Sequence, residues 1–151
     1  MNLQINVAIQ IQKPADAIFE AIVNPIHMTQ YFIGNSTGRM EEDASIIWNF
    51  PEFGGDIPIR VGKIIKNSFI SYYWNVNEEK MLVEMNLEPK KDGSTVVRIT
   101  EKEMENDETG INWLKGNTEG WANFLACLKA YLEFGINLRK GAFIFRFESV
   151  K

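Results

Sequence analysis

The chain has 151 residues, 45% of them hydrophobic and 24% charged, with a formal net charge of −4. This length is typical of one folded domain, which we expect to span residues 1–151. Lysine and arginine do not cluster, so nucleic-acid binding is not expected. No apolar run approaches the roughly 20 residues of a membrane span. The single cysteine, Cys127, and an amino terminus without signal-peptide features favour the cytoplasm.

The first part of the chain predicts one strand and two short helices. Hydrophobic and polar residues alternate over residues 2–12, a period typical of a half-buried strand. Pro14 suits the first turn of a helix, and residues 15–23 carry apolar side chains at helical spacing. Pro25 ends that helix and starts a second short one, which we expect to reach Tyr31.

The middle of the chain predicts consecutive strands. Most of the links between them are short and rich in turn-forming residues, which implies an antiparallel meander. On the clearest strand, Met81, Val83, Met85 and Leu87 face the same side. The strands are expected near residues 37–40 and at residues 45–50, 56–66, 69–75, 80–88 and 94–104.

Residues 112–134 predict a long amphipathic helix. At about 1.5 Å per residue it would be roughly 35 Å long, and it needs a broad apolar partner surface. We therefore predict an α+β fold in which a curved sheet wraps around this helix. Its inward stripe consists of Leu114, Trp121, Leu125, Leu128 and Leu132.

Three segments resemble a known family. They are VAIQIQKPADAIFEAIVNPIHMTQYF at residues 7–32, IPIRVGKIIKNSFISYYWN at residues 57–75 and GWANFLACLKAYLEFG at residues 120–135. Together they resemble the START-like (SRPBCC) superfamily, in the branch of homologues of the activator of the ninety-kilodalton heat-shock protein ATPase. The resemblance covers about residues 5–135, and the last motif is the most specific.

The resemblance implies a helix-grip fold. In this fold a curved antiparallel sheet of about six or seven strands surrounds a long C-terminal helix, and two short helices follow the first strand. It also implies a deep cavity between sheet and helix. Members of the superfamily bind lipids, sterols, polyketides or other apolar molecules, and some act as cyclases.

Residues 136–151 depart from the family pattern. Phe143, Phe145 and Phe147 alternate with other residues, which predicts an extra strand or arm. Such an arm could cover a sheet edge, or it could reach a second chain and form a homodimer. The alternative is that the long helix continues and its end frays.

The sequence contains no recognisable catalytic or metal-binding constellation. The only histidine, His27, lies in a polar turn, so a Ser-His-Asp or Cys-His arrangement is not expected. Histidine and cysteine spacing for zinc and glycine-rich phosphate loops are both missing, and we expect no metal or cofactor. Cys127 is interpreted as a small buried hydrophobic residue.

Two polar residues are candidates for chemistry. Glu101 shares a strand face with Val97 and Ile99, which makes it a candidate polar anchor or general acid; the alternative is that it faces water at the rim. Asn117 falls among the apolar positions of the long helix, one turn before Trp121. A buried asparagine needs partners, which could be a ligand, a water or the backbone of a nearby loop.

Aromatic residues could line a pocket for a flat apolar ligand, although core packing would explain each one singly. We expect the mouth of the cavity near Tyr31, Phe32, Phe53 and Trp113, which lie in or beside loops. The residues predicted to bind ligand are Tyr31, Phe32, Trp48, Phe53, Trp74, Met85, Glu101, Trp113, Asn117 and Trp121.

Three functions follow from these patterns. The first is a binding module that holds a small apolar molecule between sheet and helix. The second is a co-chaperone that binds a chaperone protein, a role that rests on the name of the family branch alone. The third is a cyclase or hydrolase with Glu101 and Asn117 as its polar pair. It ranks below binding because one carboxylate without a second acid or base is seldom enough for catalysis.

Overall fold

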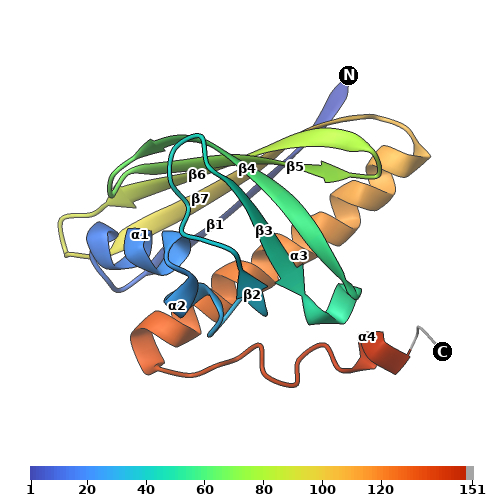
Figure 1. Cartoon of the computed structure of the whole chain (residues 1–151). Coiled ribbons are helices and arrows are strands. Elements are labelled where there is room, and N and C mark those ends of the chain that lie inside the picture. Colours follow the sequence, from blue (N-terminus) through green and yellow to red (C-terminus); the bar gives the residue numbers. More distant parts are fainter. Residues whose placement is uncertain (149–151) are drawn as a thin grey trace.

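The computed structural model describes residues 1–148, in which an antiparallel sheet curves over one long helix (Figure 1). The strands are β1 (Asn2–Ile11), β2 (Asn35–Ser36), β3 (Ser45–Phe50), β4 (Gly55–Ile65), β5 (Phe69–Val76), β6 (Glu79–Pro89) and β7 (Thr95–Glu105). The helices are α1 (Ala15–Val23), α2 (Pro25–Met28), α3 (Glu108–Phe134) and α4 (Phe145–Glu148), with a 3₁₀ turn, η1, at Pro51–Phe53.

The seven strands within the described residues are ordered β1-β7-β6-β5-β4-β3-β2, and every neighbouring pair is antiparallel. The first strand therefore closes one side of the meander by pairing with the last. Helix α3 packs chiefly against β1 and also contacts β7. Buried side chains of the sheet and of α1, α2 and α3 form one core. The predicted helix-grip fold is confirmed.

Helix α3 begins earlier than its apolar pattern predicts. The Asp107 side chain caps it by accepting a hydrogen bond from the Gly110 backbone N–H at 2.8 Å. A Cβ atom at Gly110 would lie 1.9 Å from the backbone oxygen of Glu105, so only glycine allows this close approach. The helix ends at Gly135, whose φ of 64° is the left-handed conformation typical of a helix end.

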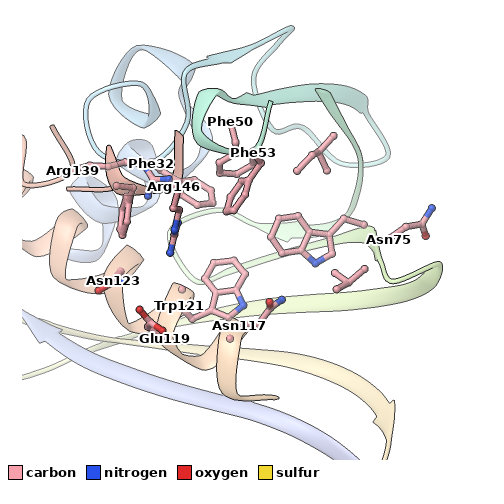
Figure 2. A pocket seen from close by; sticks show the side chains of 16 residues that line it. Phe32, Phe50, Phe53, Asn75, Asn117, Glu119, Trp121, Asn123, Arg139 and Arg146 are labelled. Carbon is pink, nitrogen blue, oxygen red and sulfur yellow. The ribbon is translucent and has the colours of Figure 1, made fainter. Parts of the chain in front are cut away.

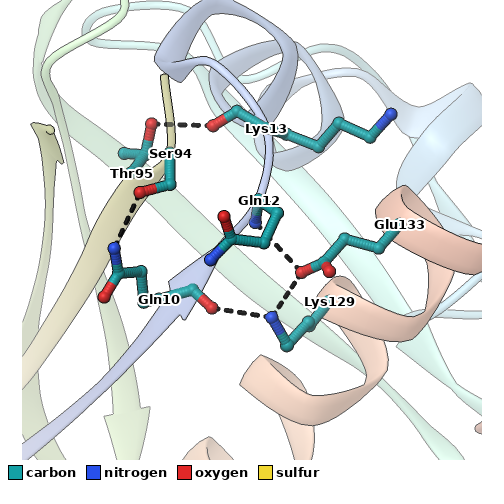
Figure 3. A network of polar contacts seen from close by, with 7 residues as sticks. All are labelled: Gln10, Gln12, Lys13, Ser94, Thr95, Lys129 and Glu133. Carbon is teal, nitrogen blue, oxygen red and sulfur yellow. Dashed lines mark hydrogen bonds and ion pairs between the residues drawn. The ribbon is translucent and has the colours of Figure 1, made fainter. Parts of the chain in front are cut away.

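The C-terminal half of α3 is fixed to the end of β1 by a polar network (Figure 3). Lys129 donates to the Gln10 backbone oxygen at 2.8 Å and pairs with Glu133. Glu133 also accepts from the Gln12 backbone N–H at 3.0 Å. Beside it, the Gln10 side chain donates to the Ser94 hydroxyl at 2.7 Å. This half of the helix is therefore held against the sheet.

Three short elements differ from their predictions. The second helix ends at Met28 rather than near Tyr31, and the strand expected near residues 37–40 is the two-residue β2. No strand forms in the tail between residues 136 and 148, where turns lead to the short α4. The helix does not continue into it either, because Gly135 ends α3.

The tail forms an arm, defined here as residues 136–146, that runs back across the molecule toward η1 (Figure 1). Gly141 adopts a positive φ of 76°, which makes a turn where a strand would be extended. The rings of Phe143 and Phe145 pack against Arg146 rather than against a neighbouring strand, and its guanidinium lies 4.2 Å from the centroid of Phe143. Residues 149–151 of the predicted strand lie outside the described residues.

Candidate functional site

A cleft of about 500 Å³ lies beside the middle of α3 (Figure 2). Its floor contains Trp74 of β5 and Asn117 and Trp121 of α3. Aromatic rings of Phe32, Phe50 and Phe53 line it from the side of η1. The arm supplies a further wall through Arg139, Phe143 and Arg146. The cleft is thus mostly aromatic, with a few polar groups, which is the usual composition of a small-molecule site.

Glu101 of β7 lies behind the floor of the cleft and binds its polar N–H groups. Its carboxylate accepts hydrogen bonds from Trp74 Nε1 at 2.7 Å, from Trp121 Nε1 at 2.9 Å and from Asn117 Nδ2 at 3.1 Å. Glu101 is fully buried and does not line the cleft. Burying a carboxylate is costly unless it is hydrogen-bonded, and these donors supply that compensation.

The local sequence explains why these groups meet. Strand alternation places Glu101 on the buried face of β7, and its neighbours across the sheet are Ile5 on β1 and Val83 on β6. Asn117 and Trp121 are four residues apart, so they lie on one face of α3. The Glu101 side chain therefore lies on the buried face of the sheet. The alternative that it faces water at the rim is wrong.

Tyr72 lies next to this group. Burial raises the pKa of its hydroxyl well above the ordinary value, and the charge of Glu101 raises it further. Within the described residues, the Tyr72 hydroxyl has no hydrogen-bond partner, and neither do the indole N–H groups of Trp48 and Trp113. Because its pKa is raised, the Tyr72 hydroxyl stays protonated.

The arm is anchored by an ion pair between Arg139 and Glu52 of η1. Burial and, to a smaller extent, the positive charge of Arg146 together lower the pKa of Arg139 to about 10. Both guanidiniums lie over the Phe143 ring, at 4.8 Å for Arg139 and 4.2 Å for Arg146. Two positive groups therefore stand close together at one wall of the cleft.

The structure brings half of the predicted ligand-binding residues to the cleft. Phe32, Phe53, Trp74, Asn117 and Trp121 line it, and Glu101 lies behind them. Whether they contact a ligand stays a prediction. Phe53, which was expected near the mouth, lines the cleft and is 62% exposed.

The other predicted residues lie in the packed core. Tyr31 and Trp113 are buried, so the mouth expected beside them is wrong. The Tyr31 hydroxyl donates to the Ala21 backbone oxygen at 2.8 Å. Trp48 and Met85 are also buried and do not line the cleft. Tyr31 was expected near the mouth of the cavity because it lies beside a loop, but its ring packs against Phe124 of α3 and its hydroxyl binds α1.

Several lining residues had not been predicted. Gly116 and Gly120 lie on α3, and Arg139, Phe143 and Arg146 lie on the arm. The glycines carry a signal in the sequence, because a glycine inside a helix costs about 1 kcal/mol relative to alanine and needs a reason. No comparable signal places the arm beside the cleft, since this contact depends on the turn at Gly141.

Within residues 1–148, no group of three histidine, cysteine, aspartate or glutamate side chains could hold a metal ion. The helices in the same part of the chain include none that is long and apolar enough to cross a membrane. Cys127 is buried as predicted, and burial raises the pKa of its thiol.

Comparison with known proteins matches residues 12–133 to the family model described as Activator of Hsp90 ATPase homolog 1-like protein. No curated protein matches the chain. Protein SSP2350 from Staphylococcus saprophyticus is 29% identical, with a TM-score of 0.76 over 89% of this chain and 94% of its own. The Aha1 dimer from Colwellia psychrerythraea is 23% identical, with a TM-score of 0.75 over 88% and 98%. CalU16 from Micromonospora echinospora is 16% identical, with a TM-score of 0.70 over 97% and 84%.

Proposed function

The chain belongs to the Activator of Hsp90 ATPase homolog 1-like family, and we propose that it binds a small, flat, largely apolar molecule in the cleft between β5 and α3. One observation carries the proposal: the two indole rings of the floor are oriented by hydrogen bonds to a single buried carboxylate. Trp74 and Trp121 have ring centroids 5.7 Å apart and are tilted by 37°. Rings fixed in this way offer a preorganised apolar surface at little entropic cost.

The glycines of α3 support the same proposal. A Cβ atom at Gly116 or Gly120 would meet no atom within 4 Å, so packing inside the protein does not require glycine there. Both positions line the cleft. Glycine in the middle of a helix lowers stability, and a ligand that lies close to the backbone would explain why two of them occur at this wall.

The role of Glu101 follows from its contacts. Both carboxylate oxygens accept hydrogen bonds from N–H donors. Glu101 does not line the cleft, and it affects the cleft only by orienting Trp74, Trp121 and Asn117. We therefore assign it a positioning role in binding. Catalysis by Glu101 and Asn117 stays a lower-ranked prediction, as does the co-chaperone role, which rests on the family name.

Binding can be measured with the neutral fluorescent probe N-phenyl-1-naphthylamine, followed by displacement with fatty acids, sterols and polycyclic aromatic compounds. Gly120→Leu should fill the cleft without a clash in the helix and reduce probe affinity by about tenfold or more. The matched control is Ala122→Leu, at an exposed helix position that does not line the cleft. Equal affinity of both variants and the unmodified chain would overturn the proposal.

A further inference from the structure

Asn117 brings an oriented amide to a cleft that is lined mostly by aromatic rings. Its Nδ2 atom donates to Glu101 Oε1 at 3.1 Å, and its side chain lies beside Trp121 on the floor (Figure 2). Within residues 1–148 this is the one hydrogen bond of the Asn117 side chain. An asparagine amide has two N–H donors and an oxygen that accepts. One N–H and the Oδ1 atom therefore remain for a molecule in the cleft.

The contact with Glu101 determines which end of the amide is left for a ligand. Glu101 is fully buried and accepts N–H groups at both of its oxygens. An amide oxygen would be repelled at this place, so Nδ2 faces Glu101 and Oδ1 lies on the other side of the amide. Donation to a carboxylate also polarises the amide, which makes Oδ1 a stronger acceptor.

Two glycines leave space for a ligand beside this amide. Gly116 precedes Asn117, and Gly120 lies three residues after it, on the same side of α3. A Cβ atom at either glycine would meet no atom within 4 Å, and both positions line the cleft. A molecule that lies on the indole rings of the floor therefore has room for a substituent next to Asn117.

Other polar groups of the cleft are less suited to select a ligand. Arg139 already pairs with Glu52. Asn123 and Glu119 line the cleft, but within residues 1–148 neither belongs to the hydrogen-bonded group around Glu101. A polar group that is oriented before binding loses less conformational entropy when a ligand arrives. Asn117 is therefore the lining group that is best prepared for a specific hydrogen bond.

From this arrangement we infer that Asn117 selects ligands that carry a hydroxyl group on their flat apolar body. The body lies on Trp74 and Trp121, and the hydroxyl donates to Asn117 Oδ1. A hydroxyl also accepts, so the remaining Nδ2 hydrogen finds a partner in the same group, whereas an ether only accepts. The inference rests on the proposed binding function and deepens it, because it names a substituent of the ligand and the residue that recognises it.

Two compounds that differ by one methyl group test this inference. 2-Naphthol and 2-methoxynaphthalene share a bicyclic body, and only the first has an O–H donor. Each displaces N-phenyl-1-naphthylamine from the chain, and the readout is the ratio of the two affinities. Because the methyl group also adds apolar surface, the ratio for the intact chain is compared with that for Asn117→Leu. The preference for 2-naphthol should be about three- to tenfold larger in the intact chain, as expected for one hydrogen bond.

Further variants locate the effect. Asn117→Ala removes the same amide with a smaller side chain and should give the same ratio as Asn117→Leu. Asn112→Leu is the matched control, at an exposed position of α3 that does not line the cleft, and should keep the ratio of the intact chain. Asn123→Leu removes an amide that lines the cleft outside the Glu101 group, and it should also keep this ratio. Urea unfolding verifies that each variant is folded.

The outcomes are distinct. An equal ratio for the intact chain and both Asn117 variants overturns the inference while the binding function stands. A change in Asn123→Leu as large as that in Asn117→Leu also overturns it, because any amide at the cleft would then serve. Displacement by neither compound from a chain that binds the probe overturns it as well. Failure of the probe and of both compounds to bind overturns the proposed function together with this inference.

Discussion

Glu101 Oε1 accepts the indole N–H of Trp121 at 2.9 Å, which joins the last strand of the sheet to the middle of the long helix. The same oxygen accepts from Asn117, and the other oxygen accepts from Trp74. One carboxylate thereby positions side chains from two elements that form the floor of the cleft. Packing and the proposed binding therefore depend on the same hydrogen bonds.

Glu101→Gln tests this dependence. Glutamine keeps one oxygen but places an amide N–H₂ group opposite one of the indole donors, so one buried N–H loses its acceptor. We expect the free energy of unfolding to fall by about 1–3 kcal/mol, and affinity for N-phenyl-1-naphthylamine to fall with it. Urea unfolding followed by tryptophan fluorescence measures the first effect.

The control for Glu101→Gln is Glu79→Gln, at an exposed position of β6. It should change unfolding by less than about 0.5 kcal/mol. An unchanged unfolding curve and unchanged probe affinity for Glu101→Gln would mean that the carboxylate does not position the floor.

A second prediction concerns two glycines of α3, one packed against the backbone and one in open space. Gly110→Ala should destabilise the protein by about 2 kcal/mol or more, because its Cβ atom would meet the Glu105 backbone oxygen. Gly116→Ala should stabilise it by about 0.5–1 kcal/mol, because alanine is the better helix former and the site is open. Thermal or urea unfolding checks both, and equal effects in the two variants would contradict the assignment.

The regular elements could be predicted because their patterns are local. Alternation over ten or so residues identifies a strand wherever its partners lie, and the apolar period of α3 identifies the helix. The full burial of Glu101 could not be predicted in the same way. It depends on neighbours from β1 and β6 and on donors from β5 and α3, which the sequence of β7 does not contain.

In the arm, by contrast, a local pattern predicted an element that does not form. Phe143 and Phe145 alternate as in a strand, but Gly141 turns the backbone and Arg146 packs on both rings, at 4.2 Å and 5.7 Å. Contacts between arginine and aromatic rings need no strand partner, so alternation alone was misleading. The same contact places Arg139 and Arg146 at the cleft, which is why these lining residues had not been predicted.

Stability should depend on pH through Glu20. Two hydrogen bonds from Arg39, at 2.7 and 2.9 Å, lower the pKa of Glu20 from 4.5 to about 2. A lowered pKa in the folded state stabilises the protein above pH 4.5, and this contribution is lost as the pH falls toward 2. Both side chains are more than a third exposed, 39% for Arg39 and 41% for Glu20, so screening keeps it below about 1 kcal/mol.

Glu20→Gln should therefore lower the free energy of unfolding at pH 7, and its difference from the unmodified chain should shrink between pH 4.5 and 2. Urea unfolding at several pH values measures this. Arg39→Gln should have the same effect, and the double variant should add little to either single one. A difference that persists at pH 2 would assign the stabilisation to another cause.

The last prediction concerns the arm and a second copy of the chain. Leu138, Ile144 and Phe145 are 49%, 59% and 61% exposed, and such side chains are more stable when a partner covers them. We propose that the arm mediates the homodimer considered from the sequence. Light scattering should give the intact chain twice the mass expected for one copy, and a chain ending at Gly135 should be monomeric.

A double variant separates the two roles of the arm. Leu138→Ser with Ile144→Ser removes exposed apolar surface but keeps Arg139, Phe143 and Arg146 at the cleft, so it should be monomeric and still bind N-phenyl-1-naphthylamine. The shortened chain loses one wall of the cleft, and its affinity for the same probe should fall by about tenfold. The same number of copies per particle for the intact and shortened chains would show that the arm does not mediate a dimer.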